Sequence, residues 1–180
     1  MKFNPATVQS HFASPLGPMV LAASPEGLTG AWFEGQQHLP PTLADWPRQP
    51  EHPLLLDAAR QLSAYFAGEQ VHFDLPLDLS GGTAFQQAVW RALLAIARGS
   101  TSSYGAISLV IGQPGAVRAT GGAIGRNPVS IIVPCHRVIG STGALTGYAG
   151  GLARKTALLR LEGALATTRT TSGNPRKPGA

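Results

Sequence analysis

The residues best suited to chemistry stand together in the run Pro134-Cys135-His136-Arg137. Cys135 is the only cysteine of the 180 residues, and it follows the β-branched run 129–133, which predicts a buried strand that Pro134 ends. A thiol reacts as the thiolate, and a neighbouring imidazole in basic surroundings favours that form. A buried, inert cysteine is the alternative, but the proline before Cys135 and the basic residues after it argue for a positioned nucleophile.

A nucleophilic cysteine needs a base, and the base needs a group that orients it. Adjacent residues of an extended chain point in opposite directions, so we expect His136 to take the thiol proton of Cys135 through a bridging water. Glu162 is the only acidic residue after position 80 and is therefore the candidate partner of His136. A surface carboxylate paired with Arg160 or Lys155 is the alternative for Glu162.

The first half of the chain, residues 1–80, predicts a mixed α/β unit. Short apolar stretches separated by turns predict an antiparallel meander of three strands at 7–13, 19–23 and 28–33. Apolar residues at helical spacing predict a helix over 54–67, and strict alternation over 71–77 predicts a further half-buried strand. The turn at Ser80-Gly81-Gly82 is the expected boundary between two domains.

The second half, residues 81–166, predicts a mostly helical unit. Thr83 and Gln86 form a capping box in front of an apolar helical stripe. Helices are then expected at 104–111 and 116–124, joined by a four-residue turn that contains two glycines. This outline is typical of a helix-turn-helix, although many helical hairpins share it. A further apolar helix is expected at 152–161, after a glycine-rich loop at 140–151 that could close over a pocket.

Charge separates the same two halves. The net charge of +5 divides into −5 for residues 1–80 and +10 for residues 81–180, which suggests that the second half faces a polyanion such as nucleic acid. The helix expected at 116–124 carries Arg118 and an unusual set of small residues: Ala119, Gly121, Gly122 and Ala123. Small side chains permit the close approach of a nucleic-acid strand, or, as the alternative, of a neighbouring helix.

Composition excludes several classes of protein. A single cysteine rules out an internal disulfide and a zinc site with two or more thiolates, so we expect no metal. No apolar run approaches the ~20 residues of a membrane span, and the N-terminus does not resemble a signal peptide. We therefore expect a soluble, cytoplasmic protein. Residues 167–180, rich in Thr, Ser, Gly and Pro, predict a disordered basic tail.

The run 134–138, Pro-Cys-His-Arg-Val, follows Arg126-Asn127-Pro128 and precedes a Gly-Tyr-Ala-Gly-Gly-Leu run at 147–152. Together these motifs resemble the O6-alkylguanine-DNA alkyltransferases, also called methylated-DNA–protein-cysteine methyltransferases. The resemblance runs from about Phe85 to Gly163 and is looser in the first half. It implies a ribonuclease-H-like N-terminal domain followed by a winged-helix-like domain with the helix-turn-helix. It also implies direct-reversal repair, in which Cys135 takes the alkyl group from O6-alkylguanine, or from O4-alkylthymine, in duplex DNA and keeps it.

The resemblance also assigns roles to individual residues of this sequence. Cys135, His136 and Glu162 would carry the transfer, Asn127 would brace the active-site turn, and Tyr104 would help to rotate the target nucleotide. Arg118 would fill the gap that the extruded base leaves. The remaining DNA contacts would come from the minor-groove helix and its neighbours, at Ala119, Gly121, Gly122, Ala123, Arg126 and Arg137. The pocket would be walled by Val138, Tyr148, Ala149, Gly150 and Gly151.

The family resemblance implies no cofactor, a double-stranded DNA partner and a monomer, and it leaves open whether copies cooperate along DNA. Two other functions remain open at this point. One is a DNA-binding lesion sensor or regulator whose cysteine does no chemistry. The other is a cysteine hydrolase that uses Cys135, His136 and Glu162, although no separate oxyanion-hole motif is evident in the sequence.

Overall fold

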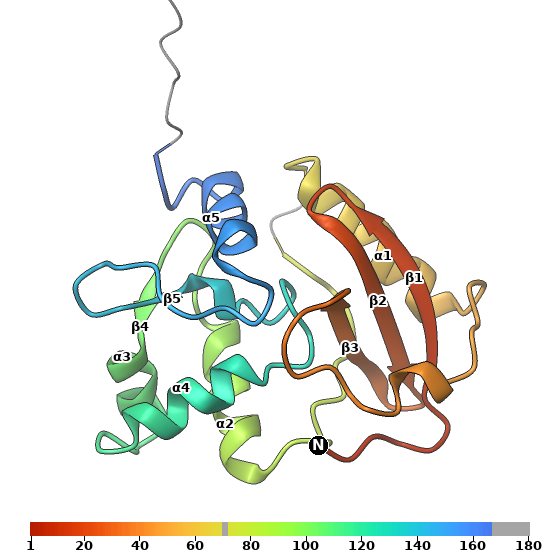
Figure 1. The fold of residues 1–180 in the computed structure, drawn as a ribbon, viewed down its shortest axis with the longest axis horizontal. Helices are drawn as coiled ribbons and strands as arrows, with labels where there is room; N and C mark the ends of the chain where they lie inside the picture. The colour runs from red at the N-terminus through yellow and green to blue at the C-terminus, as the bar shows by residue number, and fades with distance from the viewer. Residues whose placement is uncertain (70–71, 167–180) are drawn as a thin grey trace, which may run out of the picture.

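The computed structural model describes residues 1–69 and 72–166, in which two units lie side by side (Figure 1). A three-stranded sheet with one long helix forms the first unit, and short helices form most of the second. This arrangement confirms the predicted mixed α/β fold with a helical second half. The tail predicted at 167–180 lies outside the described residues.

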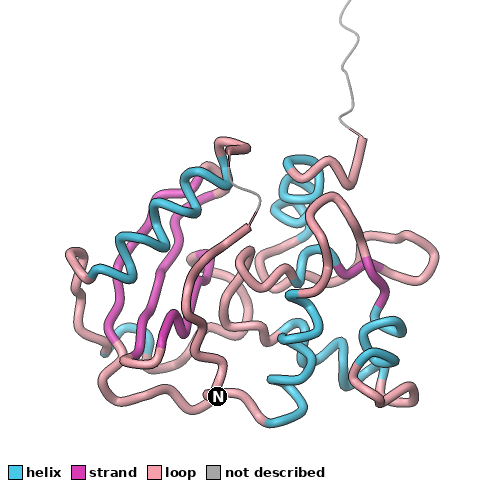
Figure 2. Tube along the Cα trace, turned by 180° about the vertical axis from the view of Figure 1, so that it is seen from behind, coloured by secondary structure: helices cyan, strands magenta, loops and turns pink. Residues whose placement is uncertain are grey.

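The first unit is an antiparallel meander with the strand order β1-β2-β3. The strands are β1 (Val8–Ser14), β2 (Gly17–Ser24) and β3 (Gly27–Phe33), and they match the three predicted stretches. Helix α1 (Pro53–Phe66) lies along one face of this sheet, as Figure 2 shows, and confirms the predicted helix. The connection before it, expected as a loop, contains one turn of 3-10 helix, Leu43–Asp45. The core between sheet and helix is made by buried apolar side chains such as Met19, Leu21, Leu55 and Leu62.

The outer edge of β3 is completed by residues from two distant parts of the chain. The backbone of Leu28 pairs with Pro76 and Asp78, whose Leu28 N–Pro76 O and Asp78 N–Leu28 O distances are 2.7 and 3.0 Å. Ala31 pairs in the same way with Pro128 and Ser130, at 2.9 and 2.8 Å. One bridge lies within the first unit and the other joins the two units. Strand β3 is buried along its whole length as a result.

The strand predicted at 71–77 is absent from the described part of that segment, residues 72–77, apart from the single bridge at Leu77. The alternating apolar side chains pack against the core, as predicted. The backbone of Asp74, however, is bonded to the side chain of Gln61, with Gln61 Nε2–Asp74 O at 2.9 Å and Asp74 N–Gln61 Oε1 at 2.8 Å. Alternation predicts which side chains are buried, but here a glutamine side chain replaces the neighbouring strand.

The second unit begins with α2 (Ala84–Leu94), whose capping box of Thr83 and Gln86 is formed as predicted. Helices α3 (Tyr104–Val110) and α4 (Val117–Gly125) follow and pack against each other and against α2, which confirms the helix-turn-helix outline. The Ser103 side chain caps α3. A small parallel pair, β4 (Ser102–Ser103) and β5 (Val138–Ile139), lies beside them, and α5 (Leu152–Leu161) closes the unit.

Residues 129–133, predicted as a strand, form a tight turn instead. The backbone N–H of Ile132 donates to Ser130 at 2.9 Å around Ile131, whose φ is 74°, and Val133 N donates to Val129 O at 2.9 Å. A positive φ is strained for a β-branched residue and marks a γ-turn of the less common kind. All five residues are buried, so the apolar run indicated burial correctly and the strand wrongly. A turn of 3-10 helix, Cys135–Arg137, follows.

The turn before α2 gives a first testable prediction. A Cβ atom on Gly82 would lie 2.3 Å from Cζ3 and 2.5 Å from Cη2 of the buried Trp90 ring. We therefore expect Gly82→Ala to lower the free energy of unfolding by about 1–3 kcal/mol, measured by urea denaturation. Gly115→Ala is the control, because nothing lies within 4 Å of its Cβ. Equal stability of the two variants would contradict this packing.

Candidate active site

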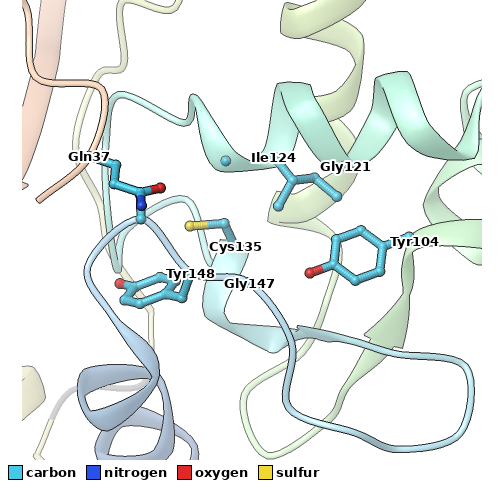
Figure 3. Close-up of a pocket in the computed structure, with 9 residues that line it drawn as sticks. Gln37, Tyr104, Gly121, Ile124, Cys135, Gly147 and Tyr148 are labelled. Carbon is cyan, nitrogen blue, oxygen red and sulfur yellow. The ribbon is translucent and has the colours of Figure 1, made fainter.

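A pocket opens between the two units, with the only cysteine at its base (Figure 3). The sulfur of Cys135 points toward the side where Gln37 and Tyr148 lie, and the Tyr104 hydroxyl points into the pocket from the opposite side. Cys135 is only 6% exposed, so a reactant reaches the sulfur only through this opening. The residues that line the pocket are Gln37, Tyr104, Gly121, Ile124, Gly125, Cys135, Gly147, Tyr148 and Ala149.

The side chain of Asn127 holds both the turn before Cys135 and the sulfur itself. Its Nδ2 donates to the Val133 carbonyl at 2.8 Å and to Cys135 Sγ at 3.1 Å, while its Oδ1 accepts the Val129 N–H at 3.0 Å. Asn127 is itself buried. One amide therefore contacts both the strained turn and the sulfur, and the bracing role that the family resemblance implies for Asn127 stays a prediction.

Burial raises the pKa of the Cys135 thiol, and the hydrogen bond from Asn127 and the charge of Lys155 only partly offset this effect. The unbound protein therefore holds a thiol at neutral pH, contrary to the thiolate that the basic sequence predicts. The basic residues that suggested a thiolate largely interact with other groups and not with the sulfur. Arg137, for example, pairs with Glu162.

The pH dependence of thiol labelling tests whether the pKa of Cys135 is raised, rather than lowered as the sequence predicts. We expect iodoacetamide to label Cys135 with a rate that still rises above about pH 8.5, the ordinary thiol value, because burial opposes ionisation. Mass spectrometry would measure the labelling rate between about pH 6 and 10. The same protein unfolded in urea provides the control, since its thiol should titrate near the ordinary value. A folded-state inflection below that of the unfolded control would contradict a raised pKa.

Glu162 lies at the C-terminal end of α5 and is buried beneath the Cys135–Arg137 turn. Its Oε1 lies 2.9 Å from Nε2 of His136, and its two oxygens accept Arg137 Nε and Nη2, each at 2.8 Å. These hydrogen bonds hold the pKa of the Glu162 carboxyl far below its usual range, although burial acts in the opposite direction. The surface pairing with Arg160 or Lys155 considered from the sequence is excluded by this burial.

The tautomer of His136 follows from its partner. An ionised carboxylate only accepts hydrogen bonds, so Nε2 of His136 carries the proton and Nδ1 keeps the lone pair. Within residues 1–69 and 72–166, Nδ1 is buried with no hydrogen-bond partner. Burial lowers the pKa of His136, and Arg137 and Lys155 add to this effect, while Glu162 opposes it. His136 is therefore a neutral imidazole with a free basic nitrogen next to Cys135 in the chain.

The glycine-rich loop is attached to α5 by a buried ammonium group. Lys155 is fully buried, and its Nζ donates to the carbonyls of Val138, Thr146 and Gly147 at 2.6, 2.6 and 3.1 Å. The Tyr104 hydroxyl donates to the same Thr146 carbonyl at 3.0 Å. Burial lowers the pKa of Lys155 to about 8. The loop wall of the pocket is therefore fixed by a lysine for which sequence analysis assigned only a possible surface pairing.

The residues expected to contact DNA divide between the surface and the interior. Arg118, Ala119 and Arg126 are exposed on or next to α4, and Gly121 lies beside the Tyr104 ring at the pocket wall. Gly122 accepts a hydrogen bond from Arg126 at 3.2 Å. Two other expected contacts are corrected by the structure. The Ala123 side chain is buried and its carbonyl accepts Trp90 Nε1 at 2.9 Å, while the guanidinium of Arg137 is buried in the ion pair with Glu162.

The expected pocket wall is also only partly right. Tyr148 and Ala149 line the pocket, whereas Gly150 and Gly151 do not. Gly150 lies where a Cβ would be 2.7 Å from the Tyr148 ring, and Gly151, with φ of 88°, precedes α5. Val138 is buried and its carbonyl accepts Lys155 Nζ. The sequence analysis missed Gln37, whose N–H donates to the Ala149 carbonyl at 3.0 Å; no local pattern marks a loop residue that reaches the site from another unit.

No helix in the described ranges 1–69 and 72–166 has the length and apolar character needed to cross a membrane. Among the same residues, no group of three or more His, Cys, Asp and Glu side chains is arranged to hold a metal ion.

Comparison with known proteins identifies both units. Residues 8–79 match the family described as 6-O-methylguanine DNA methyltransferase, ribonuclease-like domain, and residues 84–164 match the corresponding DNA binding domain. A Mycobacterium tuberculosis protein named methylated-DNA--protein-cysteine methyltransferase is 53% identical over 149 residues, covering 83% of this chain and 88% of its own. A Methanosarcina acetivorans protein of the same name is 49% identical over 152 residues, covering 84% and 96%.

Solved structures give the same result. The crystal structure of the M. tuberculosis O6-methylguanine methyltransferase has a TM-score of 0.80 and 49% identity, covering 92% of this chain and 98% of that one. The structure described as M. tuberculosis OGT in complex with DNA has a TM-score of 0.78 and 51% identity, covering 86% and 91%. On these sequence and structural matches, the chain belongs to the O6-methylguanine DNA methyltransferase family.

Proposed function

We propose that this protein repairs DNA by direct reversal, transferring the alkyl group of O6-alkylguanine, and of O4-alkylthymine, from duplex DNA to its own Cys135. The observation that carries the proposal is the sole cysteine at the base of the pocket, with Asn127 on its sulfur and His136, paired with Glu162, next to it in the chain. The names of the relatives support the same reaction. The proposal includes a protein that acts as a monomer in the cytoplasm.

The chemistry is a displacement at carbon. Nδ1 of His136 takes the Cys135 thiol proton through water, while Glu162 holds the imidazole and stabilises the imidazolium that forms. The sulfur then forms a bond to the alkyl carbon as the bond from that carbon to O6 breaks, with its electron pair going to the guanine. The Tyr104 hydroxyl, which points into the pocket and donates to the Thr146 carbonyl, would turn from that carbonyl to hydrogen-bond the departing base. Guanine takes one proton from water and the His136 imidazolium returns the thiol proton to water, so the protons balance.

The alkyl carbon of a stacked base lies inside the duplex, so the nucleotide must rotate out into the pocket. Rotation costs a few kcal/mol, which contacts in the pocket and groove offset. Helix α4 presents Arg118 and Ala119 on its exposed side and Gly121 on the pocket wall, which suits a helix that lies against DNA next to the extruded base. The product is a thioether that water does not cleave, so each molecule reacts once.

The proposed role of Arg118 leads to a specific prediction. If Arg118 fills the gap left in the stack, Arg118→Ala should slow repair of a duplex by about tenfold or more, through the loss of base-stack and phosphate contacts. Reaction with free O6-benzylguanine needs no extrusion and should be unchanged. Arg160→Ala, an exposed change on α5, is the matched control for charge. Equal losses on the duplex and on the free base would contradict the stacking role.

The proposal is tested by incubating the protein with a duplex that contains radiolabelled O6-methylguanine. We expect one label per protein molecule, located on Cys135 by peptide mapping, and none on Cys135→Ala. Label released to water with multiple turnovers would instead identify a hydrolase. Label that stays on tightly bound DNA would identify a lesion sensor. Either of these outcomes would overturn direct reversal.

A further inference from the structure

The first unit contacts Oε1 of Glu162 in the proposed catalytic network. Tyr65, in the last turn of α1, donates its hydroxyl to Oε1 of Glu162 at 2.7 Å, across 97 positions of sequence. The Tyr65 side chain is buried, and its pKa is raised by burial and by the neighbouring Glu162 charge, so the hydroxyl stays protonated and remains a donor. The transfer chemistry described above does not use this contact.

The donors to Glu162 are unequally divided between its two oxygens. Oε1 accepts from the Tyr65 hydroxyl at 2.7 Å, His136 Nε2 at 2.9 Å and Arg137 Nη2 at 2.8 Å, whereas among residues 1–69 and 72–166 only Arg137 Nε, at 2.8 Å, donates to Oε2. The tyrosine hydroxyl and the imidazole therefore share the electron density of one oxygen. A donor that is added to or removed from this oxygen changes how strongly it attracts the proton of His136.

The ring of Tyr65 is held in place from both units. Phe66 and Phe73 pack around it at centroid distances of 5.4 Å each. Arg98, which follows α2, lies with its guanidinium carbon 5.3 Å from the ring centroid and donates to the Leu161 carbonyl at 3.2 Å. The same side chain thus contacts Tyr65 and the end of the helix that carries Glu162. The hydroxyl position is consequently set by packing on both sides of the domain interface.

We propose that Tyr65 is a positioning residue for alkyl transfer, through which the N-terminal unit orients Glu162 and limits the basicity of His136. The proposal rests on the proposed function, in which His136 removes the thiol proton. The charged and titratable groups around this network are Arg137 and Cys135 on the active-site turn, Lys155 on α5, Arg98 after α2, Tyr148 in the glycine-rich loop and Tyr65 itself, while His72 lines a pocket beside Arg137. Tyr65 is the residue of the first unit that donates to Glu162.

Tyr65→Phe removes the hydroxyl and keeps the ring. Without this donor Glu162 becomes a stronger acceptor toward His136, so the pKa of the imidazole rises. As the pH is lowered, His136 is therefore protonated, and lost as a base, at a higher pH than in the wild-type protein. We expect the acid limb of the pH profile for single-turnover methyl transfer to move up by about half a pH unit or more. At neutral pH this shift alone changes the rate by less than about twofold, and we expect a further fall of about five- to tenfold because Glu162 loses one of the contacts that orient it toward His136.

Phe73→Leu is the matched control, because it disturbs the same aromatic cluster without touching Glu162. Phe73→Leu should leave the acid limb of the pH profile at the same pH as in the wild-type protein. The proposal is overturned if Tyr65→Phe leaves both rate and acid limb unchanged, or if it slows transfer while the limb stays in place, as for a change that affects packing alone.

A second measurement separates this proposal from the repair reaction. NMR titration of His136, assigned by comparison with His136→Gln, reports the imidazole pKa in DNA-free protein. Tyr65→Phe should raise this pKa, and Phe73→Leu should not. If the wild-type protein transfers no alkyl group, the proposed function fails while this shift still supports the contact between Tyr65 and the network. An unshifted His136 in Tyr65→Phe overturns the positioning role whether or not transfer occurs.

Discussion

Replacing Glu162 with glutamine is expected to remove about 3–5 kcal/mol from the free energy of unfolding, because Arg137 is then a buried charge with no carboxylate partner. Small domains are stable by about 5–15 kcal/mol, so the variant should fold poorly or unfold at low urea. Alkyl transfer should fall at least a hundredfold, since His136 loses the group that orients it and stabilises its charge. Urea denaturation and single-turnover transfer measure the two effects. Glu51→Gln, at an exposed acid, should change neither.

The pH dependence of stability provides a second measure of the same network. Folded His136 resists protonation, so the unfolded chain binds more protons below about pH 6.5 and stability falls there as pH falls. The lowered pKa of Glu162 adds a steeper loss as pH falls below about 4.3 and through the folded-state value. Glu162→Gln should keep the first loss and reduce the second to the part contributed by Asp78, whose carboxyl pKa is also lowered because the hydrogen bonds from Ser24 and Ser80 outweigh its burial. An unchanged acid branch in this variant would contradict the assigned ion pair.

The other large effect is expected at Asn127. Asn127→Ala leaves the buried Val129 N–H without its partner and leaves the Val133 carbonyl with the Cys135 N–H alone, at a cost of about 1–3 kcal/mol in the free energy of unfolding. The strained turn is then free to relax and displace the sulfur. A displacement of about 1 Å costs on the order of a hundredfold in rate, so methyl transfer should fall by at least that factor.

Asn127→Asp separates support of the turn from the effect on sulfur. An aspartate oxygen still accepts the Val129 N–H, but the donor that faced Cys135 Sγ becomes a second acceptor. The variant should therefore raise the pKa of Cys135 further, as iodoacetamide labelling would show. A Cys135 pKa equal to or below the wild-type value would argue against the hydrogen bond from Asn127 to the sulfur.

The sequence contained enough information to predict the helices and the meander. Helix ends are set by local interactions, such as the capping box of Thr83 and Gln86 and the cap at Ser103, so they can be predicted from neighbouring residues. The two mispredicted strands fail for a shared reason. At 71–77 and 129–133 the apolar pattern indicated burial, but the side chains of Gln61 and Asn127 bond backbone groups there that a neighbouring strand would otherwise pair. Which side chain will satisfy a backbone group is decided by tertiary packing.

In the candidate site, too, residues that stand out locally were predicted, and residues placed by tertiary packing were missed. Cys135, His136 and Glu162 were found because a lone thiol and a lone acid stand out by residue type. Tyr65 and Gln37 were not found, because each reaches the site from the first unit and no spacing in the sequence links them to it. Arg137 was wrongly predicted to contact DNA for a related reason. A count of charges does not reveal which arginine forms a buried ion pair, as Arg137 does with Glu162.

The completed edge of β3 has a consequence for biosynthesis. This strand obtains its second partner only from residues near 76–78 and 128–130, so the edge stays open while the ribosome makes the intervening chain. An open strand edge is a template for pairing with another nascent chain. The first unit, although it emerges early, is thus exposed to misassembly until the active-site turn has been made and docked. The segment that closes the sheet is the one that presents the nucleophile, so a chain with an open edge would also lack a properly held Cys135.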